Sequence, residues 1–297
     1  MVYAFLAVLA GAMISSQSSC NGVLYPYIGV LGVGFISPFL NAVFSYIFHL
    51  VSEKKPLRLN GMPVHASFGG FCSVFVLGLS GYCVARLGTA VSVCLSVSGQ
   101  LFMSAIVDHF GLFGTEKVSF HSIRIPGFLC ILAGIFIINF AGADSFSSID
   151  SRGILFLMLL LALVIGFVTV MARMFTYEAT RYVGRFGASC INSLVGSAGA
   201  LVLILITTGF RPSLSGYVEA PLVSYLTGPL GTVSCYLSNI AYDKIKVFYA
   251  TICLLVGQIA AGIAADLYML GSFHPGKIIG IAVVCAGIFW DKKHTAA

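Results

Sequence analysis

The sequence predicts an all-α membrane protein of ten transmembrane helices, arranged as two inverted five-helix repeats over residues 1–145 and 146–297. Of its 297 residues 59% are hydrophobic and only 9% are charged, whereas a soluble domain carries about 25% charged residues. Apolar stretches of roughly 20 residues, enough to cross a hydrocarbon core of about 30 Å as a helix, recur along the whole chain. A residue pattern from the first half also recurs in the second.

Charged or Pro/Gly-rich breaks separate the apolar stretches and delimit the expected helices. The first repeat is expected to hold helices at 3–20, 30–51, 64–85, 89–107 and 123–142. The second repeat is expected to hold helices at 153–174, 186–209, 219–240, 247–265 and 276–290. No Lys or Arg precedes the first stretch and no clean cleavage site follows it, so it is expected to be a retained helix. Gly29, Gly32 and Gly34, followed by Pro38, predict a kinked or closely packed second helix.

The basic residues predict the orientation, because cytoplasmic loops carry the excess of Lys and Arg. With ten helices both termini lie on one side. That side would carry Lys54, Lys55, Arg58, Lys117, Arg124, Arg173, Arg181, Arg185, Lys244, Lys246, Lys292 and Lys293. Only Arg86, Arg152, Arg211 and Lys277 would lie opposite. The split of 12 to 4 predicts a multi-pass protein of a plasma (inner) membrane with both termini in the cytoplasm, and the net charge of +6 is a topology signal, not a nucleic-acid footprint.

The internal repeat appears when the chain is displaced by 158 residues against itself. This displacement aligns Leu79-Ser80 with Leu237-Ser238, Arg86 with Lys244, Gly99-Gln100 with Gly257-Gln258, and Asp108 with Asp266. Five helices is an odd number, so the second half would run inverted through the membrane. Inverted repeats are a recurring architecture of secondary transporters, which bind substrate near the midplane between the halves and work by alternating access. The repeat therefore predicts transport as a class and leaves the cargo open.

Gln100 and Gln258 fall near the middle of their helices, where a side-chain amide facing lipid would be costly. They are expected to face the bundle interior. There they either line the path of the solute or cross-link helices at the pseudo-two-fold axis, and the sequence leaves both readings open.

Further polar and aromatic residues are candidates for substrate binding: Gln17, Asn21, Asn41, Tyr82, Asn192, Tyr236 and Asn239. Gln17 and Asn21 are four residues apart and share a helix face. Alternatively, Asn21-Gly22 ends the first helix. For Tyr82, Tyr236 and Asn239, packing is an alternative to contact with cargo.

Three acidic residues are candidates for gating or protonation: Asp108, Asp266 and Glu178. The alternative for the two aspartates is helix termination or pairing with a neighbouring base. Arg173, Glu178 and Arg181 cluster near the expected inner end of the sixth helix, where an interfacial ion pair would explain them. The first and fourth helices contain no central carboxylate for proton exchange. This lack of buried charge favours a neutral, zwitterionic or weakly cationic cargo.

Other function classes lack their motifs. The nine cysteines form no CxxC pair and the six histidines no HExxH motif, so no metal, cofactor or enzymatic activity is expected. No GxxxxGK[ST] loop for ATP is present. The expected partners are a small-molecule substrate and membrane lipids. A functional monomer is expected because both halves are fused, although the Gly276-x-x-x-Gly280 spacing is compatible with a homodimer contact.

Gln17 and Asn21, then Gly99-Gln100, then the run Asp108-His109-Phe110-Gly111-Leu112-Phe113-Gly114 resemble the drug/metabolite transporter superfamily. Within it they resemble the subfamily of inner-membrane exporters whose five-helix unit occurs single or fused in tandem. The resemblance implies a ten-helix inverted-repeat bundle with a central cavity and efflux of small organic compounds. Thr176 stands where the second half would carry the counterpart of Asn21, so a symmetric role for Asn21 is in doubt. A lipid-handling or structural assembly subunit is the alternative function.

Overall fold

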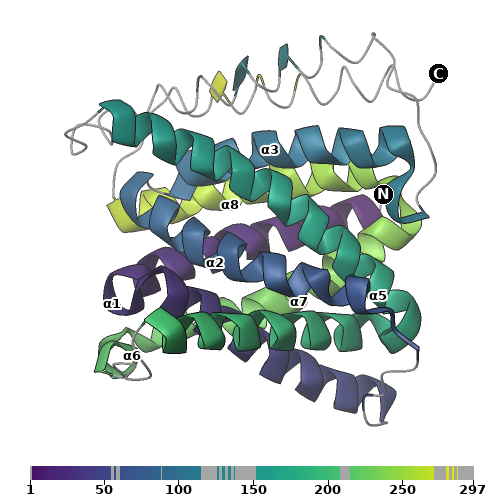
Figure 1. Ribbon diagram of the computed structural model, residues 1–297. Helices are drawn as coiled ribbons and strands as arrows, with labels where there is room; N and C mark the ends of the chain where they lie inside the picture. Colours follow the sequence, from purple (N-terminus) through teal and green to yellow (C-terminus); the bar gives the residue numbers. More distant parts are fainter. Residues whose placement is uncertain are drawn as a thin grey trace.

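The computed structural model describes residues 2–54, 57, 61–87, 89–114, 152–207 and 215–270, together with isolated positions within 126–137 and 279–286. All regular elements in this part of the chain are helices, and most of them lie side by side along one common direction (Figure 1). Val2–Glu53, Val64–Leu87 and Leu160–Thr207 are long and apolar enough to cross a membrane, and shorter apolar helices span Leu95–Val107 and Tyr249–Ala265. The chain is therefore an all-α integral membrane protein.

Helices α1 (Val2–Glu53) and α5 (Arg152–Thr207) each consist of two arms joined at a glycine. Gly29 has φ 67° and ψ −177° inside α1, and Gly184 has φ 74° and ψ 171° inside α5. Side chains on L-residues disfavour this backbone conformation, so glycine permits the turn at both points. Gly29 lies just before the expected second helix, 30–51, and no residue within that range departs from helical backbone, so the expected kink inside it is absent. Close packing, the other expectation for this stretch, is present at Gly34, where a Cβ would lie 2.9 Å from the Val74 carbonyl oxygen.

The first arm of each kinked helix is longer than the sequence indicated. Asn21-Gly22 does not end the first arm, which continues past Pro26 to the turn at Gly29. The sixth helix, expected to end at residue 174, continues to the turn at Gly184. The charged residues between 173 and 183 do not mark a helix end, because they are compatible with helical backbone and only Gly184 departs from it.

Replacing Gly29 by alanine should destabilise the protein by about 1–3 kcal/mol through backbone strain alone. No atom lies within 4 Å of the position that a Cβ would take at Gly29, so steric overlap does not contribute. The free energy of unfolding in detergent would measure this effect. The control is Gly199→Ala, a helical glycine at which a Cβ would lie 3.8 Å from its nearest neighbours. Equal stabilities for the two variants would contradict the need for glycine at the turn.

The remaining membrane helices come in two similar sets. α2 (Phe68–Leu87) follows the short 3₁₀ helix η1 (Val64–Ser67), and α7 (Thr227–Lys244) follows η5 (Leu222–Leu226). Pro63 precedes η1 and Pro221 precedes η5 in the same N-cap position. α3 (Thr89–Phe110) and α8 (Val247–Leu270) come next in each set; η2 (Leu112–Gly114) follows α3, and α6 (Ser215–Glu219) precedes η5.

Two pairs of glycines bring each kinked helix into close contact with one helix of these sets. A Cβ added at Gly11 would overlap the Leu254 carbonyl oxygen, and one added at Gly257 would overlap that of Val8. The same relation joins the first arm of α5 to α3 through Gly166 and Gly99. The first arm of α1 thus packs on α8, and the first arm of α5 packs on α3 (Figure 1). Backbones at such distances pack by van der Waals contact between small residues, as is common in membrane bundles.

The largest cluster of buried apolar residues lies where these helices meet. It joins Ala7 and Ala10 of α1, Met103 of α3, Met174 of α5 and Leu254 of α8. The helices expected at 123–142 and 276–290 lie outside the described residues apart from isolated helical positions. The count of ten helices therefore stays a prediction.

Candidate functional site

A cavity lined by both apolar and polar side chains lies between α1, α2, α3, α5, α7 and α8. The cavity volume is about 170 Å³. One water molecule needs roughly 10–15 Å³ on the same scale. Side chains with amide or guanidinium groups on its wall are Gln17, Asn41, Gln100, Arg173, Asn192, Asn239 and Gln258. Serines from α1, α2, α3, α5 and α7 add hydroxyl groups. The cavity has room for a small organic molecule.

Gln100 and Gln258 meet at the centre of the bundle. Each is almost fully buried, with 1% and 2% of its surface exposed. Gln100 Nε2 donates to Gln258 Oε1 at 3.2 Å, and Gln258 Nε2 donates to Gln100 Oε1 at 3.4 Å. The pair therefore links α3 to α8, and both residues also line the cavity. The two glutamines thus both cross-link helices and line the cavity.

Arg173 points its guanidinium at this pair. Its Nη1 donates to Gln100 Oε1 at 2.9 Å, and the half-buried side chain is part of the cavity wall. The expectation of an interfacial ion pair with Glu178 is wrong, because Glu178 instead lies 3.1 Å from His65 Nε2. Arg173 sits about three turns before the Gly184 turn, deep in the first arm of α5.

Gln17 and Asn41 come from the two arms of α1. Gln17 is 7% exposed and makes no hydrogen bond among the described residues, so its amide faces the cavity unpaired. Gly231 of α7 leaves room for it, since a Cβ there would lie 2.6 Å from Gln17 Nε2. Asn41 Oδ1 accepts from the hydroxyl groups of Thr232 at 2.8 Å and Ser45 at 3.1 Å.

Asn192 and Asn239 complete the amide wall. Asn192 Oδ1 accepts from the backbone N–H of Gly70 at 2.8 Å, and its Nδ2 donates to the Ala188 carbonyl oxygen at 3.3 Å. These bonds fix Asn192 between α5 and α2. Asn239 Nδ2 donates to Cys235 Sγ at 3.6 Å, while its Oδ1 has no hydrogen-bond partner among the described residues.

Other candidates lie away from the cavity. Asn21 is fully buried and accepts hydrogen bonds from Ser37 at 2.6 Å and Thr227 at 2.8 Å, so it joins both arms of α1 to α7. Tyr82 packs edge to face on Tyr25 with ring centroids 5.3 Å apart. Neither residue is on the cavity wall. Asp108 and Asp266 lie in the last turns of α3 and α8, and their side chains lie outside the described part.

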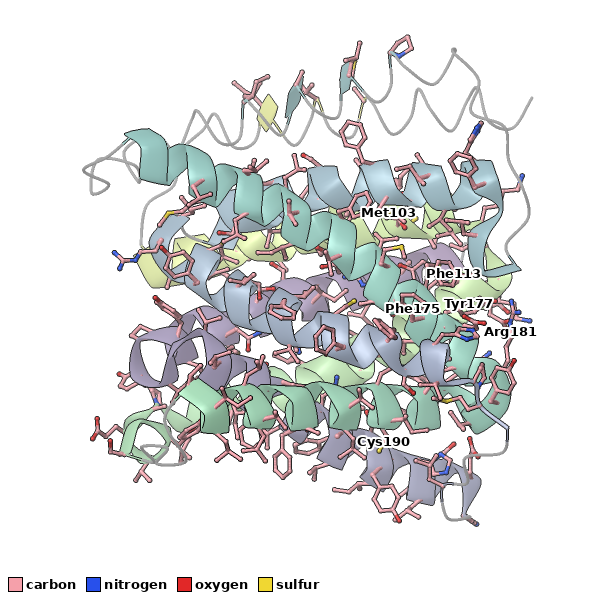
Figure 2. The ribbon with its side chains drawn as sticks, viewed as in Figure 1. Met103, Phe113, Phe175, Tyr177, Arg181 and Cys190 are labelled. Carbon is pink, nitrogen blue, oxygen red and sulfur yellow. The ribbon has the colours of Figure 1, made fainter. Side chains whose placement is uncertain are left out.

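A second cavity lies at one end of the bundle, where Asn239 belongs to the walls of both. Tyr236 lines this second cavity and stacks on Phe186 with centroids 4.3 Å apart. Arg185 Nη2 donates to Asp243 Oδ2 at 3.1 Å across the same space. Figure 2 shows Arg181 beside Tyr177 and Phe113 at this end, where Arg181 donates to the Phe113 carbonyl oxygen.

The wall of the central cavity carries side chains suited to binding a polar solute. Among the described residues that line it there is no Asp, Glu, His, Phe, Tyr or Trp. Within the same described part, no group of three His, Cys, Asp or Glu residues gathers as a metal site would. Amides, hydroxyls and one guanidinium hold and orient a polar solute.

Sequence reasoning missed two features of the site. Arg173 lies inside the bundle and not at the expected membrane surface, and Arg185 pairs with Asp243, which the sequence does not predict. The signal for Arg173 was available: counting back from the next glycine, Gly184, places it well inside an apolar helix.

A bundle of apolar helices around a cavity that carries amide and hydroxyl side chains is typical of membrane proteins that bind small solutes within the bilayer. One family model, described as "Putative inner membrane exporter, YdcZ", matches the chain twice, over residues 2–137 and 157–290. The chain belongs to this family and carries its unit twice in tandem. It is therefore an integral protein of the inner-membrane exporter type.

A solved structure titled "Crystal structure of protein" is similar to the chain. The similarity covers 97% of this chain and 94% of that chain with a TM-score of 0.63, at 16% sequence identity. At this identity the likeness concerns the fold alone. No curated protein matches the chain.

Proposed function

We propose that this protein is a secondary exporter that moves a small organic metabolite or xenobiotic across the inner membrane by alternating access. The observation that carries the proposal is the cavity between the tandem units, whose wall carries amide side chains including Gln17, which has no hydrogen-bond partner among the described residues. The Gln17 amide faces the cavity with its donors and acceptor available, so it can hydrogen-bond to a solute there.

The finer architecture that we propose is ten helices in two inverted repeats, residues 1–145 and 146–297. Three pairs of features support it: the Gly29 and Gly184 turns, the Pro63 and Pro221 caps, and the Gly11 and Gly166 contacts. Gly29 lies beside α6, and Gly184 lies beside Glu53, about 36 Å further along α1 at 1.5 Å per residue (Figure 1). Turns at opposite ends are what inversion requires.

We also propose that both termini are cytoplasmic and that the monomer is functional. Supporting this orientation, Arg181 and Arg185 line the end cavity together with Glu53 and Asp243. His65, the partner of Glu178, precedes the first turn of α2, whereas Arg86 lies in its last turn. Arg86 is therefore at the opposite membrane surface, as the proposed orientation requires. The Gly276-x-x-x-Gly280 spacing is not needed for this function, and Gly276 lies outside the described residues.

Among the candidates, we propose that Gln17, Asn41, Gln100, Asn192, Asn239 and Gln258 contact the cargo. In alternating access the two units rock about the centre, and the reciprocal Gln100–Gln258 bonds lie where the units meet. Asn21 and Tyr82 act in packing. For Tyr236 we propose contact with the cargo at the inner end of the bundle. For Glu178, Asp108 and Asp266 we propose a role in gating or protonation.

Release of solutes from proteoliposomes tests transport. Vesicles loaded with a mixture of amino acids, organic acids, nucleobases, amines and quaternary ammonium compounds are sampled over time by mass spectrometry. We expect one chemical class to leave faster than from protein-free vesicles, and Gln17→Leu to slow that release by tenfold or more, about 1.4 kcal/mol. Tyr82→Phe, away from the cavity, is the control.

Two outcomes would argue against transport. If no class leaves faster than from empty vesicles, the exporter proposal fails, and a purified protein that retains a lipid in the cavity would favour the lipid-handling alternative. If Gln17→Leu and Tyr82→Phe release the solute equally fast, the central cavity is not the path.

A further inference from the structure

We infer that the cargo is a small organic monoanion and that its carboxylate binds the guanidinium of Arg173. This inference rests on the proposed transport function and names the chemical class that the same cavity takes. Four observations carry it: the charge of the cavity wall, the donors left on Arg173, the composition of the wall and the unpaired amides.

The described residues of the cavity wall carry one formal charge, that of Arg173. Arg173 is always protonated at physiological pH, and among the described lining residues there is no carboxylate to neutralise it. The described acidic side chains lie elsewhere: Glu53 near His49, Glu178 on His65, Asp243 on Arg185, and Glu219 exposed at the end of α6. A cation at membrane depth attracts an anion strongly, because the surrounding medium screens little.

The guanidinium has donors to spare. It carries five N–H groups in a rigid fork that fits a carboxylate with two parallel hydrogen bonds. Among the described residues Arg173 makes one hydrogen bond, to Gln100 Oε1 at 2.9 Å. Since Gln100 also bonds to Gln258, an anion on Arg173 would lie beside the junction of α3 and α8. Its arrival and release would then act directly on the contact between the two units.

The described wall is not suited to organic cations. Quaternary ammonium and other organic cations are held by aromatic rings or carboxylates, and the described lining contains neither. The expectation of a neutral, zwitterionic or weakly cationic cargo rested on the absence of buried charge. That premise is wrong, because Arg173 lies in the cavity and not at the membrane surface.

The position related to Arg173 in the first unit carries no charge. Arg173 stands three residues before Thr176, and Ser18 stands three residues before Asn21, the counterpart of Thr176; both Ser18 and Arg173 line the cavity. The charge is thus supplied once, which suits a single carboxylate better than a doubly charged phosphate. The unpaired groups of Gln17 and Asn239 would hold hydroxyl or carbonyl groups on the rest of the molecule.

Matched pairs of carboxylates and carboxamides test the inference. Short hydroxy- and keto-acids, the carboxamide of each, and choline are measured by thermal stabilisation of the detergent-purified protein and by release from proteoliposomes. We expect the acids to bind at least tenfold more tightly than their amides and choline not to bind. Arg173→Gln, which keeps a donor for Gln100, should weaken acid binding tenfold or more. Arg173→Lys should weaken it less, and Arg86→Gln, an exposed arginine at the end of α2, should match the wild type.

The outcomes separate this inference from the proposed function. Release of choline or of amides as fast as acids, unchanged in Arg173→Gln, would overturn the anion site and leave the exporter standing. Binding of acids that Arg173→Gln loses, without release from any vesicle, would support the anion site and overturn transport. If Arg173→Gln does not fold, the acid and amide comparison on the wild type decides alone, and equal affinities would refute the inference.

Discussion

Gly257→Ala is expected to destabilise the protein by at least about 1–3 kcal/mol, the usual effect of overpacking a close-packed interior. The added methyl would overlap the backbone carbonyl oxygen of Val8 and lie 2.9 Å from the amide nitrogen of Ala12. Both are backbone atoms of a buried helix, so neither can rotate away as a side chain would. α1 and α8 would have to separate along their whole contact.

Thermal unfolding in detergent measures this loss, with Gly199→Ala as the matched control. At Gly199 the same methyl would meet Phe71 and Val74 at 3.8 Å, an ordinary van der Waals distance. The control should be neutral or slightly stabilising, because alanine favours helix over glycine by about 1 kcal/mol. A Gly257→Ala variant as stable as this control would show that α1 and α8 do not pack closely.

Gln258→Leu is expected to destabilise the protein by about 1–3 kcal/mol, because it removes both reciprocal hydrogen bonds with Gln100, each worth about 0.5–1.5 kcal/mol. Gln100 keeps its bonds to Ser96 Oγ and Arg173. Gln100→Leu should cost more, since it also removes the acceptor of the Arg173 hydrogen bond. The double variant Gln100→Leu/Gln258→Leu should be less destabilised than the sum of the two single variants. When both partners become apolar, no amide is left unpaired at the junction.

The four proteins of this cycle are compared by their free energies of unfolding. An interaction energy of about 0.5–3 kcal/mol is expected for residues in direct contact. Perfect additivity would mean that the two glutamines do not interact, and it would remove the junction on which the proposed rocking motion depends. Flux measurements on the same variants show whether the link also matters for transport.

The sequence predicted the centre of the molecule well. The repeat aligned Gln100 with Gln258, and these residues, 158 positions apart, do bond to each other. Mid-helix amides carry this signal because lipid cannot satisfy them, so they must face the interior. Hydropathy also predicted the order of the described membrane helices, because side chains that face lipid are apolar.

Positions near expected helix ends were predicted poorly. A charged residue in an apolar run usually marks the membrane surface, and Arg173 was interpreted this way. That rule cannot distinguish a charge that faces water outside from one that faces a polar cavity inside. Asn21 shows the converse: its hydrogen bonds to Ser37 and Thr227 depend on how α1 folds back at Gly29, which no local pattern reveals.

The fused chain also permits an asymmetry that a dimer of identical units cannot have. In such a dimer any side chain near the two-fold axis occurs twice, so a cavity would carry two arginines or none. Here one polypeptide supplies both walls, and Ser18 and Arg173 differ at related positions of the same cavity. Tandem duplication therefore frees each wall to change separately, and a single charge can be placed where homodimeric symmetry would force a pair.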